Sequence, residues 1–440
     1  MAKIHKIWAR QILDSRGIPT VETACQLDTG HVAVTSVPGG TSTGTYEAVE
    51  LRDKDEKRYK GKSVSQAVSN VNLVLGPALF GLDPSQQEEL DNKLIQMDGT
   101  ENKSKYGANA ILSVSEVIAK AAAISMQQSL YTWVFNLGQR AGLQIAFKMP
   151  TPLFNMINGG LHGAGNLDFQ EFFVIPSSTK SYTASLQAGA EIYITIGENL
   201  ERKGAIHSVG QEGGYAPNLF TNADALELIV ESIKQTPYKL GRDVSMGLDV
   251  AASVFFKNGV YQIRDKTSPM DDNGMIDYYK NLNERYNLAV IEDPLHEDAW
   301  DSWGKLNKIL GQQLVIVGDD LLVTNPKRVD RAIKENACNA LLVKPNQIGT
   351  VTETLKVIKK ARDANWKIVV SHRSGDTNDW FIADFAVGVG ADFVKFGAPA
   401  RGERVAKYNR LSSIESEITA VEVKQSPIQP NGKEKEEKKQ

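Results

Sequence analysis

Six short apolar runs in the second half of the chain each end at a charged or polar residue, and segments of helical length separate most of them. The runs are SMGLDV, AVIEDP, LVIVGDD, ALLVKPN, KIVVSHR and DFVKFG. The polar residues at their ends are Asp249, Glu292, Asp319, Lys344, His372 with Arg373, and Lys395. Parallel strands of a closed barrel bring their carboxyl ends to one rim, where the active sites of such barrels lie. The pattern therefore predicts that these residues meet at a single site.

The spacing of the strand ends supports the barrel. From Asp249 to Lys344, successive ends are 25 to 43 residues apart, which is enough for one strand, one helix and two loops. The intervening stretches place apolar residues at helical intervals; they are MIDYYKNLNERY, WDSWGKLNKIL, NPKRVDRAIKENA and TVTETLKVIKKARDA. An open doubly wound sheet would also place polar groups at the carboxyl ends of strands, but the number of units favours the closed barrel.

The first part of the chain has a different pattern. The segments IWARQILDSRG, PTVETACQLD and HVAVTSVP, separated by glycine-containing turns, predict a strand meander, and helical stretches follow it. Strands followed by helices are typical of an α+β domain. We therefore predict an α+β domain at residues 1–140 and an α/β barrel domain at 141–425, with the segment RAGLQIAFKMPTP near the boundary. Residues 426–440 are rich in Lys and Glu without apolar periodicity, which predicts a disordered charged tail.

Composition narrows the function classes. With 41% hydrophobic and 23% charged residues and a net charge of −3, the chain has no basic field for nucleic acid or an anionic membrane. Its two cysteines, Cys25 and Cys338, are far apart in apolar contexts, which argues against a disulfide framework and a zinc site. No apolar run approaches the roughly 18 residues of a membrane span, and no signal peptide is evident. We expect a cytoplasmic protein.

The strand-end residues point to a metal site. Asp249, Glu292 and Asp319 lie among the cations Lys344 and Lys395, a combination suited to a divalent ion facing an anionic substrate. Any one of these carboxylates could instead cap a helix or form a surface ion pair. Three together at barrel strand ends favour the metal site.

Longer strings surround these residues and run in a fixed order from Lys6 to Ile418. They are LDSRGIPTVE, SVPGGTSTGTYEAVELRD, DGTENKSKYGANAILSVS, NGGLHGAGNLDFQEF, GQEGGYAPN, IEDPLHEDAW, DDLLVTNP, KPNQIGT, SHRSGDTNDWFIAD and GAPARGERVAKYN. In these strings the chain resembles the enolase family itself rather than only the wider superfamily. Enolases interconvert 2-phosphoglycerate and phosphoenolpyruvate with magnesium, on a modified (β/α)8 TIM barrel preceded by an N-terminal α+β domain. The resemblance implies the same fold and reaction here.

The resemblance assigns the proton-transfer roles. Lys344 matches the base that removes the substrate C2 proton, and this requires a pKa lowered by burial or by nearby cations such as Lys395. Glu212 matches the acid that protonates the departing hydroxyl. This role requires a raised pKa of Glu212, and like-charge repulsion from Glu171 could raise it. Glu171 would also help to position the hydroxyl or water, and His162 matches a loop histidine that closes over the substrate.

The remaining assignments concern binding. Arg373 and Ser374 match the phosphate anchors, since guanidinium offers a bidentate fork and serine a hydroxyl donor. Gln170 matches a substrate contact, and Lys395 would also touch the substrate carboxylate. His372, beside these anchors, is interpreted as a core or supporting residue.

The resemblance implies two magnesium ions per active site. Asp249, Glu292 and Asp319 match the ligands of the first, and their hard oxygen atoms suit magnesium better than zinc or copper. Ser42, in the loop GGTSTGT, matches a ligand of the second ion, which arrives with substrate. This loop lacks the GK[ST] ending of a nucleotide phosphate loop.

The chain departs from the usual enolase strings at several positions without losing an assigned residue. Gly39 and Thr41 replace serine and alanine in the loop, and Gln211 stands beside the proposed acid where Asp or Asn is usual. Ala252, Val254 and Pro345 are further departures. Such changes could alter loop closure, the pKa of Glu212 or local packing.

Two alternative functions stay open. One is a superfamily lyase acting on another carboxylate, against which the phosphate anchors argue. The other is a non-catalytic enolase-like scaffold, for which the charged tail is weak support. By resemblance alone, the expected assembly is a homodimer or homo-octamer, with 2-phosphoglycerate and phosphoenolpyruvate as small-molecule partners.

Overall fold

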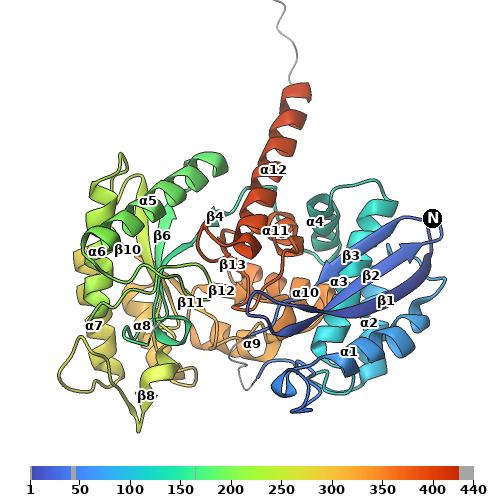
Figure 1. The fold of residues 1–440 in the computed structure, drawn as a ribbon, viewed down its shortest axis with the longest axis horizontal. Coiled ribbons are helices and arrows are strands. Elements are labelled where there is room, and N and C mark those ends of the chain that lie inside the picture. Colours follow the sequence, from blue (N-terminus) through green and yellow to red (C-terminus); the bar gives the residue numbers. More distant parts are fainter. Residues whose placement is uncertain (1, 41–45, 164, 426–440) are drawn as a thin grey trace, which may run out of the picture.

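The computed structural model describes residues 2–40, 46–163 and 165–425, with side chains to residue 420. The predicted metal ligand Ser42, the departure Thr41 and the predicted tail 426–440 lie outside the described residues. Figure 1 shows the first strands and helices on the right and the sheet of the second part, with its helices, at the centre and left.

The first part is an antiparallel sheet covered by helices, which confirms the predicted meander. Its strands are β1 (Ile4–Leu13), β2 (Pro19–Leu27) and β3 (Val32–Ser36), in that order across the sheet. The turns between them need left-handed backbone at Gly17 and Gly30 (φ 73° and 88°), which glycine adopts at little cost. The helices are α1 (Ser65–Asn70), α2 (Gln87–Asp98), α3 (Ala108–Ser125) and α4 (Leu130–Arg140).

The helical part of the first part of the chain contains a break between residues 125 and 130, where α3 ends and α4 begins. Gln127 adopts left-handed backbone (φ 52°) between α3 and α4, which ends the first helix. By length and mean hydropathy alone, α3 could cross a membrane, but 89% of it is buried inside the protein. It packs against β2 and β3, so α3 is the core helix of the first part. The apolar face of α4 joins the hydrophobic core of the barrel.

The second part contains the predicted parallel strands. They are β7 (Val244–Asp249), β10 (Leu288–Glu292), β11 (Val315–Gly318), β12 (Ala340–Val343), β13 (Lys367–Ser371) and β14 (Phe393–Lys395), and each pairs in parallel with the next. The sheet continues through β4 (Thr151–Pro152) at one end and through β6 (Glu171–Pro176) and β5 (Phe154–Asn158) at the other.

This sheet closes on itself. β4 pairs with β14, whereas β5 pairs with β6 at the opposite end of the strand order, and only Leu153 separates β4 from β5. The two ends of the sheet are therefore one stretch of chain. The closed barrel predicted from the strand ends is confirmed, and the open doubly wound sheet is excluded.

One barrel strand runs against the others. β6 is antiparallel to both β5 and β7. As a result its first residue, Glu171, lies where the parallel strands end, and it pairs in register with Asp249, the last residue of β7. The reversed direction of β6 thus places its first residue at the rim where the parallel strands have their last residues.

Side chains alternate between two cores along the barrel strands. Val290, Val317 and Leu342 belong to a cluster inside the barrel, whereas their neighbours Ile291 and Ile316 pack towards the surrounding helices. Such alternation is expected for a filled barrel.

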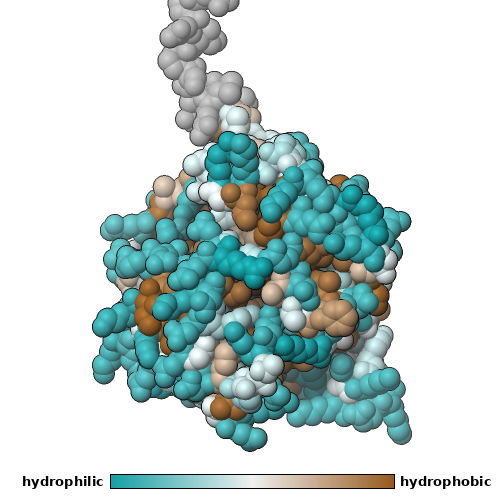
Figure 2. All heavy atoms as spheres, turned by 90° about the vertical axis from the view of Figure 1, so that its left-hand side faces the viewer, coloured by the Kyte–Doolittle hydropathy of each residue, from teal (hydrophilic) through white to brown (hydrophobic). Residues whose placement is uncertain are grey.

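The helices of the second part are α5 (Tyr182–Arg202), α6 (Asn222–Lys234), α7 (Asp272–Tyr286), α8 (Trp300–Leu310), α9 (Pro326–Glu335), α10 (Val351–Asp363), α11 (Phe381–Gly388) and α12 (Gly402–Gln425). The face seen in Figure 2 is mainly hydrophilic, with separate hydrophobic patches.

Short elements complete the fold. β8 (Phe256–Lys257) and β9 (Val260–Tyr261) form a small hairpin. The short helical turns are η1 (Tyr59–Gly61), η2 (Val71–Leu75), η3 (Pro77–Leu79), η4 (Gly160–His162), η5 (Ala252–Phe255) and η6 (Pro345–Gln347).

The first part of the chain also caps a barrel helix. At the start of α10, Val351 N donates to Ser115 Oγ at 2.9 Å and Thr352 N donates to Asp91 Oδ2 at 3.0 Å. Unpaired amide groups at a helix start need such acceptors. Because α10 follows the η6 turn and Lys344, these contacts tie the first part of the chain to one side of the rim. The predicted boundary at residue 140 stays a prediction.

Candidate active site

A cavity of about 210 Å³ opens at the carboxyl-end rim of the barrel. It collects most of the residues that the sequence singled out: His162, Gln170, Glu171, Glu212, Asp249, Asp319, Lys344, His372, Arg373, Ser374 and Lys395. Glu292 is 1% exposed and contacts Lys395. The structure therefore brings together every predicted site residue within its described ranges.

Lys395 is enclosed by carboxylates. Its Nζ lies 2.8 Å from Asp249 Oδ2, 2.8 Å from Glu292 Oε1 and 3.6 Å from Glu171 Oε1. The strand register explains the arrangement, since Asp249 and Glu292 pair side by side on β7 and β10. Burial alone would lower the pKa of Lys395, but Asp249 and the two glutamates raise it well above its ordinary value. Lys395 is thus a fixed cation.

Lys344 also carries a charge in this structure. Its Nζ lies 2.5 Å from Asp319 Oδ2. Burial and the cations Arg373 and Lys395 act to lower the pKa of Lys344, yet Asp319 outweighs them and the pKa is raised. The expectation of a lowered pKa is therefore wrong here, because the charge of Asp319 outweighs burial and the neighbouring cations.

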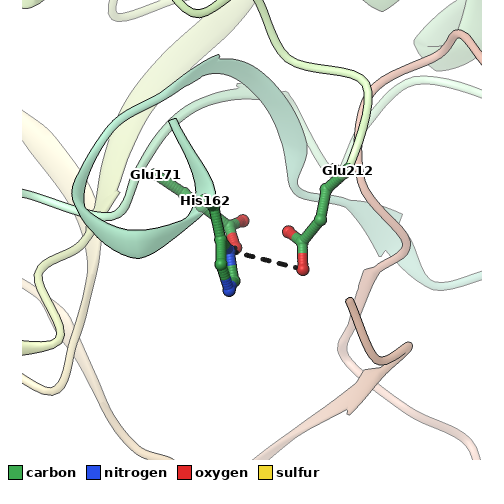
Figure 3. Close-up of side chains that lie close together, drawn as sticks. All are labelled: His162, Glu171 and Glu212. Carbon is green, nitrogen blue, oxygen red and sulfur yellow. Dashed lines mark hydrogen bonds and ion pairs between the residues drawn. The ribbon is translucent and has the colours of Figure 1, made fainter. Parts of the chain in front are cut away.

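Three further side chains form a compact group on the cavity wall: His162, Glu171 and Glu212 (Figure 3). His162 Nδ1 lies 3.3 Å from Glu171 Oε1 and 3.4 Å from Glu212 Oε1. Burial would lower the pKa of His162, but the charges of the two glutamates raise it to about 10. Burial and the neighbouring Glu212 raise the pKa of Glu171 to about 8.

The expected pKa of Glu212 is also corrected. Burial would raise it, but His162 and His372 hold it well below the usual range of a glutamate. Within this group, His162 and Glu171 therefore hold protons more tightly than Glu212 does. The two histidines, which sequence reasoning did not weigh against Glu171, cause the reversal.

His372 belongs to the cavity wall rather than only to the core. Its Nδ1 lies 2.8 Å from Nη1 of buried Arg404, and because a guanidinium only donates hydrogen bonds, Nδ1 is the acceptor. The ring proton of neutral His372 is then on Nε2, 3.4 Å from Glu212 Oε2. Burial and Arg404 lower the pKa of His372 to about 4, which favours this neutral form.

The cation expected to hold phosphate already has partners. Arg373 Nη1 donates to Glu47 Oε2 at 3.0 Å and to Asn346 Oδ1 at 3.1 Å. Ser374 follows it on the cavity wall. Sequence reasoning missed Glu47, because nothing in the string TYEAVELRD distinguishes this carboxylate from a surface residue.

Sequence reasoning also missed two aspartates, Asp293 and Asp320, although each directly follows a predicted metal ligand. We call the carboxylates at this edge of the barrel the acidic rim; they are Asp249, Glu292, Asp293, Asp319 and Asp320. Asp293 accepts hydrogen bonds from the backbone amides of Asp319 (3.0 Å) and Asp320 (2.7 Å). Asp293 and Asp320 both line the cavity. The doubled acids in IEDP and GDD were the available signal.

The acidic residues fit a divalent metal ion. Glu292, Asp293 and Asp319 each offer a carboxylate oxygen, and these atoms lie within 4.8 Å of one another. Glu292 Oε2 is buried and has no hydrogen-bond partner among the described groups. Burial and the nearby Asp249 raise the pKa of Glu292 well above its ordinary value. A bound cation would relieve this crowding, and oxygen-only ligands suit magnesium.

His162, Glu171 and Glu212 also lie close enough to hold an ion. Imidazole is a less suitable ligand for magnesium than carboxylate oxygen. The group at Glu292 is therefore the better magnesium site.

Among the described residues, the departures from the usual strings do not keep the predicted site residues from meeting in one cavity. Val254 is 41% exposed at the cavity, whereas Ala252 is buried. Pro345 begins the η6 turn, where the first position favours proline. A Cβ at Gly39 would lie 2.9 Å from Glu50 Oε1, so a serine there would displace that side chain.

Comparison with protein families agrees with this geometry. Residues 4–134 match the model described as "Enolase, N-terminal domain". Residues 146–427 match the model described as "Enolase, C-terminal TIM barrel domain". The two matches cover most of the chain and both of its structural parts. The chain therefore belongs to the enolase family.

Proposed function

We propose that this protein is a phosphopyruvate hydratase, which reversibly dehydrates 2-phosphoglycerate to phosphoenolpyruvate with magnesium. One observation carries the proposal: a single cavity holds a lysine base candidate, Lys344, a histidine–glutamate group around Glu212, and separate cations for two anionic ends of a substrate. Family membership supports the reaction class.

The cations define how the substrate would lie. Arg373 and Ser374 would hold the phosphate, through a guanidinium fork and a hydroxyl donor. Lys395, whose charge is fixed by its carboxylate neighbours, would face the substrate carboxylate. Gln170 Nε2, now 2.9 Å from Asp249 Oδ2, would add a polar contact.

Lys344 would remove the proton from C2, and the electron pair of the C–H bond would move towards the carboxylate as an enediolate. Lys344 must first lose its own proton. Asp319 now holds the ammonium, so its engagement as a metal ligand would weaken this pair and lower the pKa of Lys344. A base lysine near neutral pH needs such a change.

Departure of the C3 hydroxyl completes the reaction. Glu212 would deliver a proton to the hydroxyl, and the C3–O bond would break with its electron pair leaving on the water oxygen. The electron pair held in the enediolate would form the C2=C3 double bond. His162 holds its proton more tightly than Glu212 does in this structure. Substrate binding would therefore first have to raise the pKa of Glu212, so that a proton could pass to it from His162. The group thus acts as a shared proton reserve.

The expected cofactor fits the acidic rim. Asp249, Glu292 and Asp319 would hold magnesium, and Ser42 would contribute to a second ion. Asp249 pairs in register with Glu292. Asp293, the other acid of the group described above, accepts hydrogen bonds from the backbone amides of Asp319 and Asp320 and would hold this part of the rim in place. A bound magnesium ion acts as a Lewis acid that stabilises negative charge on the substrate carboxylate, a pattern already known for enolase-superfamily sites with a lysine or histidine base.

The direct test is the ultraviolet absorbance of phosphoenolpyruvate after mixing purified protein with 2-phosphoglycerate and magnesium, with a chelator control. Chelator-sensitive turnover is expected. Folded, magnesium-binding protein without turnover would contradict the proposal and favour a superfamily lyase acting on another carboxylate, or a non-catalytic scaffold.

We also propose a cytoplasmic homo-oligomer, either a dimer or an octamer. The resemblance to enolases supports the assembly. The net charge of −3 agrees with the proposed location, because the composition has no excess of basic residues for binding anionic membranes or nucleic acid. Sedimentation of the purified protein measures the assembly, and a monomer at micromolar concentration would contradict it.

A further inference from the structure

The proposed phosphate anchor already binds a carboxylate of the same chain. Arg373 Nη1 lies 3.0 Å from Glu47 Oε2, and Arg373 Nη2 lies 3.4 Å from Glu47 Oε1. Both guanidinium nitrogens thus face both carboxylate oxygens, the forked geometry in which arginine also binds phosphate. Glu47 therefore uses the donor groups that a phosphate would need.

The pair is withdrawn from solvent. The side chains of Arg373 and Glu47 are each 6% exposed, and both residues line the cavity. A second anion brought to this guanidinium would meet the Glu47 carboxylate at close range in a poorly screened place. Like charges at such distances repel strongly.

The backbone near Glu47 is held independently of Arg373. Ala48 N donates to Gln347 O at 2.8 Å, and the Arg328 guanidinium lies 4.1 Å from the centre of the Tyr46 ring. Gln347 Nε2 also donates to Glu47 Oε1, at 3.4 Å. Because the main chain has these contacts of its own, rotation of the Glu47 side chain could remove the carboxylate from Arg373 without movement of the main chain, while the contact of Arg373 with Asn346 stays.

We propose that Glu47 is an internal competitor for the anion site at Arg373, displaced when a phosphoryl group binds. A phosphoryl dianion gains more from the buried guanidinium than a carboxylate monoanion does. Singly charged anions would therefore displace Glu47 poorly, and Glu47 would select for phosphoryl ligands. The inference deepens the proposed function, and it requires only that an anion binds at Arg373.

The cost of the competition can be measured. If Glu47 occupies Arg373 about nine-tenths of the time, the apparent dissociation constant of an added anion rises about tenfold. Replacing the carboxylate by an amide removes the competing charge. Glu47→Gln is therefore expected to bind inorganic phosphate about tenfold more tightly than the unchanged protein, by isothermal titration calorimetry in magnesium.

Two further variants separate the contact from the charge. Glu101→Gln makes the same change in net charge at a side chain that is 81% exposed and pairs with Lys327, and its phosphate affinity is expected to equal that of the unchanged protein. Glu47→Asp keeps the charge but is one methylene shorter, so it loses the contact with Arg373. It is also expected to bind phosphate more tightly.

The outcomes are decisive whether or not 2-phosphoglycerate is the substrate, because inorganic phosphate is the probe. Equal or weaker binding by Glu47→Gln, in protein with an unchanged melting temperature, would overturn the inference and make Glu47 a support for Arg373. Tighter phosphate binding by Glu47→Gln, with no change in Glu47→Asp, would also overturn the inference. The negative charge at this position would then weaken phosphate binding without any contact with Arg373. If Glu47→Gln does not fold, Glu47→Asp decides the question.

Discussion

Lys344 shows how one neighbour sets the chemistry of a residue. Its ammonium is held by Asp319 at 2.5 Å, against the lowering influence of burial, Arg373 and Lys395. The structure therefore shows the lysine in its resting, protonated form. A base at this position would have to be released by a change at Asp319, so we expect proton abstraction to depend, through this one carboxylate, on what occupies the acidic rim.

The proposed roles of Lys344 and Glu212 predict different losses for two variants. Lys344→Ala removes the base, so exchange of the substrate C2 proton with solvent should fall by at least about 100-fold, the lower range for a general base. Glu212→Gln leaves the base in place, so exchange should continue while net dehydration stops. Proton exchange is followed by NMR in deuterated buffer and dehydration by absorbance.

The exposed Lys305, on the outer helix α8, supplies a control, since Lys305→Ala should affect neither readout. Continued proton exchange in folded Lys344→Ala would show that another group is the base.

At the residue scale, the sequence predicted which side chains meet but not their charge states. Strand-end position was enough to place Asp249, Glu292 and Lys344 at one rim. The pKa of Glu212 depends instead on His162 and His372, at 3.4 Å each. Differences of a few ångströms decide such balances, and sequence spacing does not carry that information.

At the element scale, direction is the feature that the sequence did not reveal. The parallel strands were predicted because each apolar run ends in a polar residue at the rim. β6 is buried along its whole length, and a run of buried apolar residues reads the same in either direction. Only its pairing with β5 and β7 shows that Glu171 begins the strand at the rim.

Helix α3 carries a buried acid that makes a pH-dependent contribution to stability. Burial, and then the charge of Asp379, raise the pKa of Glu116 to about 8. The folded protein thus binds this proton more tightly than the unfolded chain. The stabilisation is complete below the unfolded pKa of about 4.5 and is lost as pH rises through about 8.

Glu116→Gln is isosteric with the protonated acid and cannot ionise. Relative to the unchanged protein, its free energy of unfolding should therefore increase between pH 5 and pH 8, by about 1 kcal/mol or more. Urea unfolding at both pH values measures the difference. Glu89→Gln, at an exposed position of α2, is the matched control and should follow the unchanged protein. A constant difference for Glu116→Gln across this range would show that Glu116 is ionised in the fold.

At the scale of the whole molecule, the two parts of the chain complete one another. Glu47 from the first part contacts Arg373 at the rim, and Asp91 and Ser115 cap the barrel helix α10. These partners are hundreds of residues apart in sequence, so no local pattern predicts them. The change of sequence pattern near residue 140 predicted the division into two parts, whereas the contacts between them came only from the structure.

We expect the acidic rim to make the stability of the whole protein depend on magnesium. Glu292 lies among like charges, with one buried oxygen that has no partner in the described structure. An ion that binds only the folded state stabilises it by about 2.7 kcal/mol at a concentration 100-fold above its dissociation constant. The melting temperature should therefore rise by several degrees when chelator is replaced by magnesium at constant ionic strength.

Glu292→Gln should be at least as stable as the unchanged protein without magnesium and less stable with it. Without metal the variant relieves repulsion among the carboxylates while its amide oxygen can still accept from Lys395, so its melting temperature should equal or exceed that of the unchanged protein. With magnesium it lacks a ligand and should gain little, so the unchanged protein becomes the more stable of the two. Glu101→Gln, at an exposed residue that belongs to neither of the groups able to hold a metal ion in the described residues, should keep the full magnesium response. If Glu292→Gln responds to magnesium as strongly as Glu101→Gln does, the ion is not bound by Glu292, and the residues holding it must be sought elsewhere on the rim.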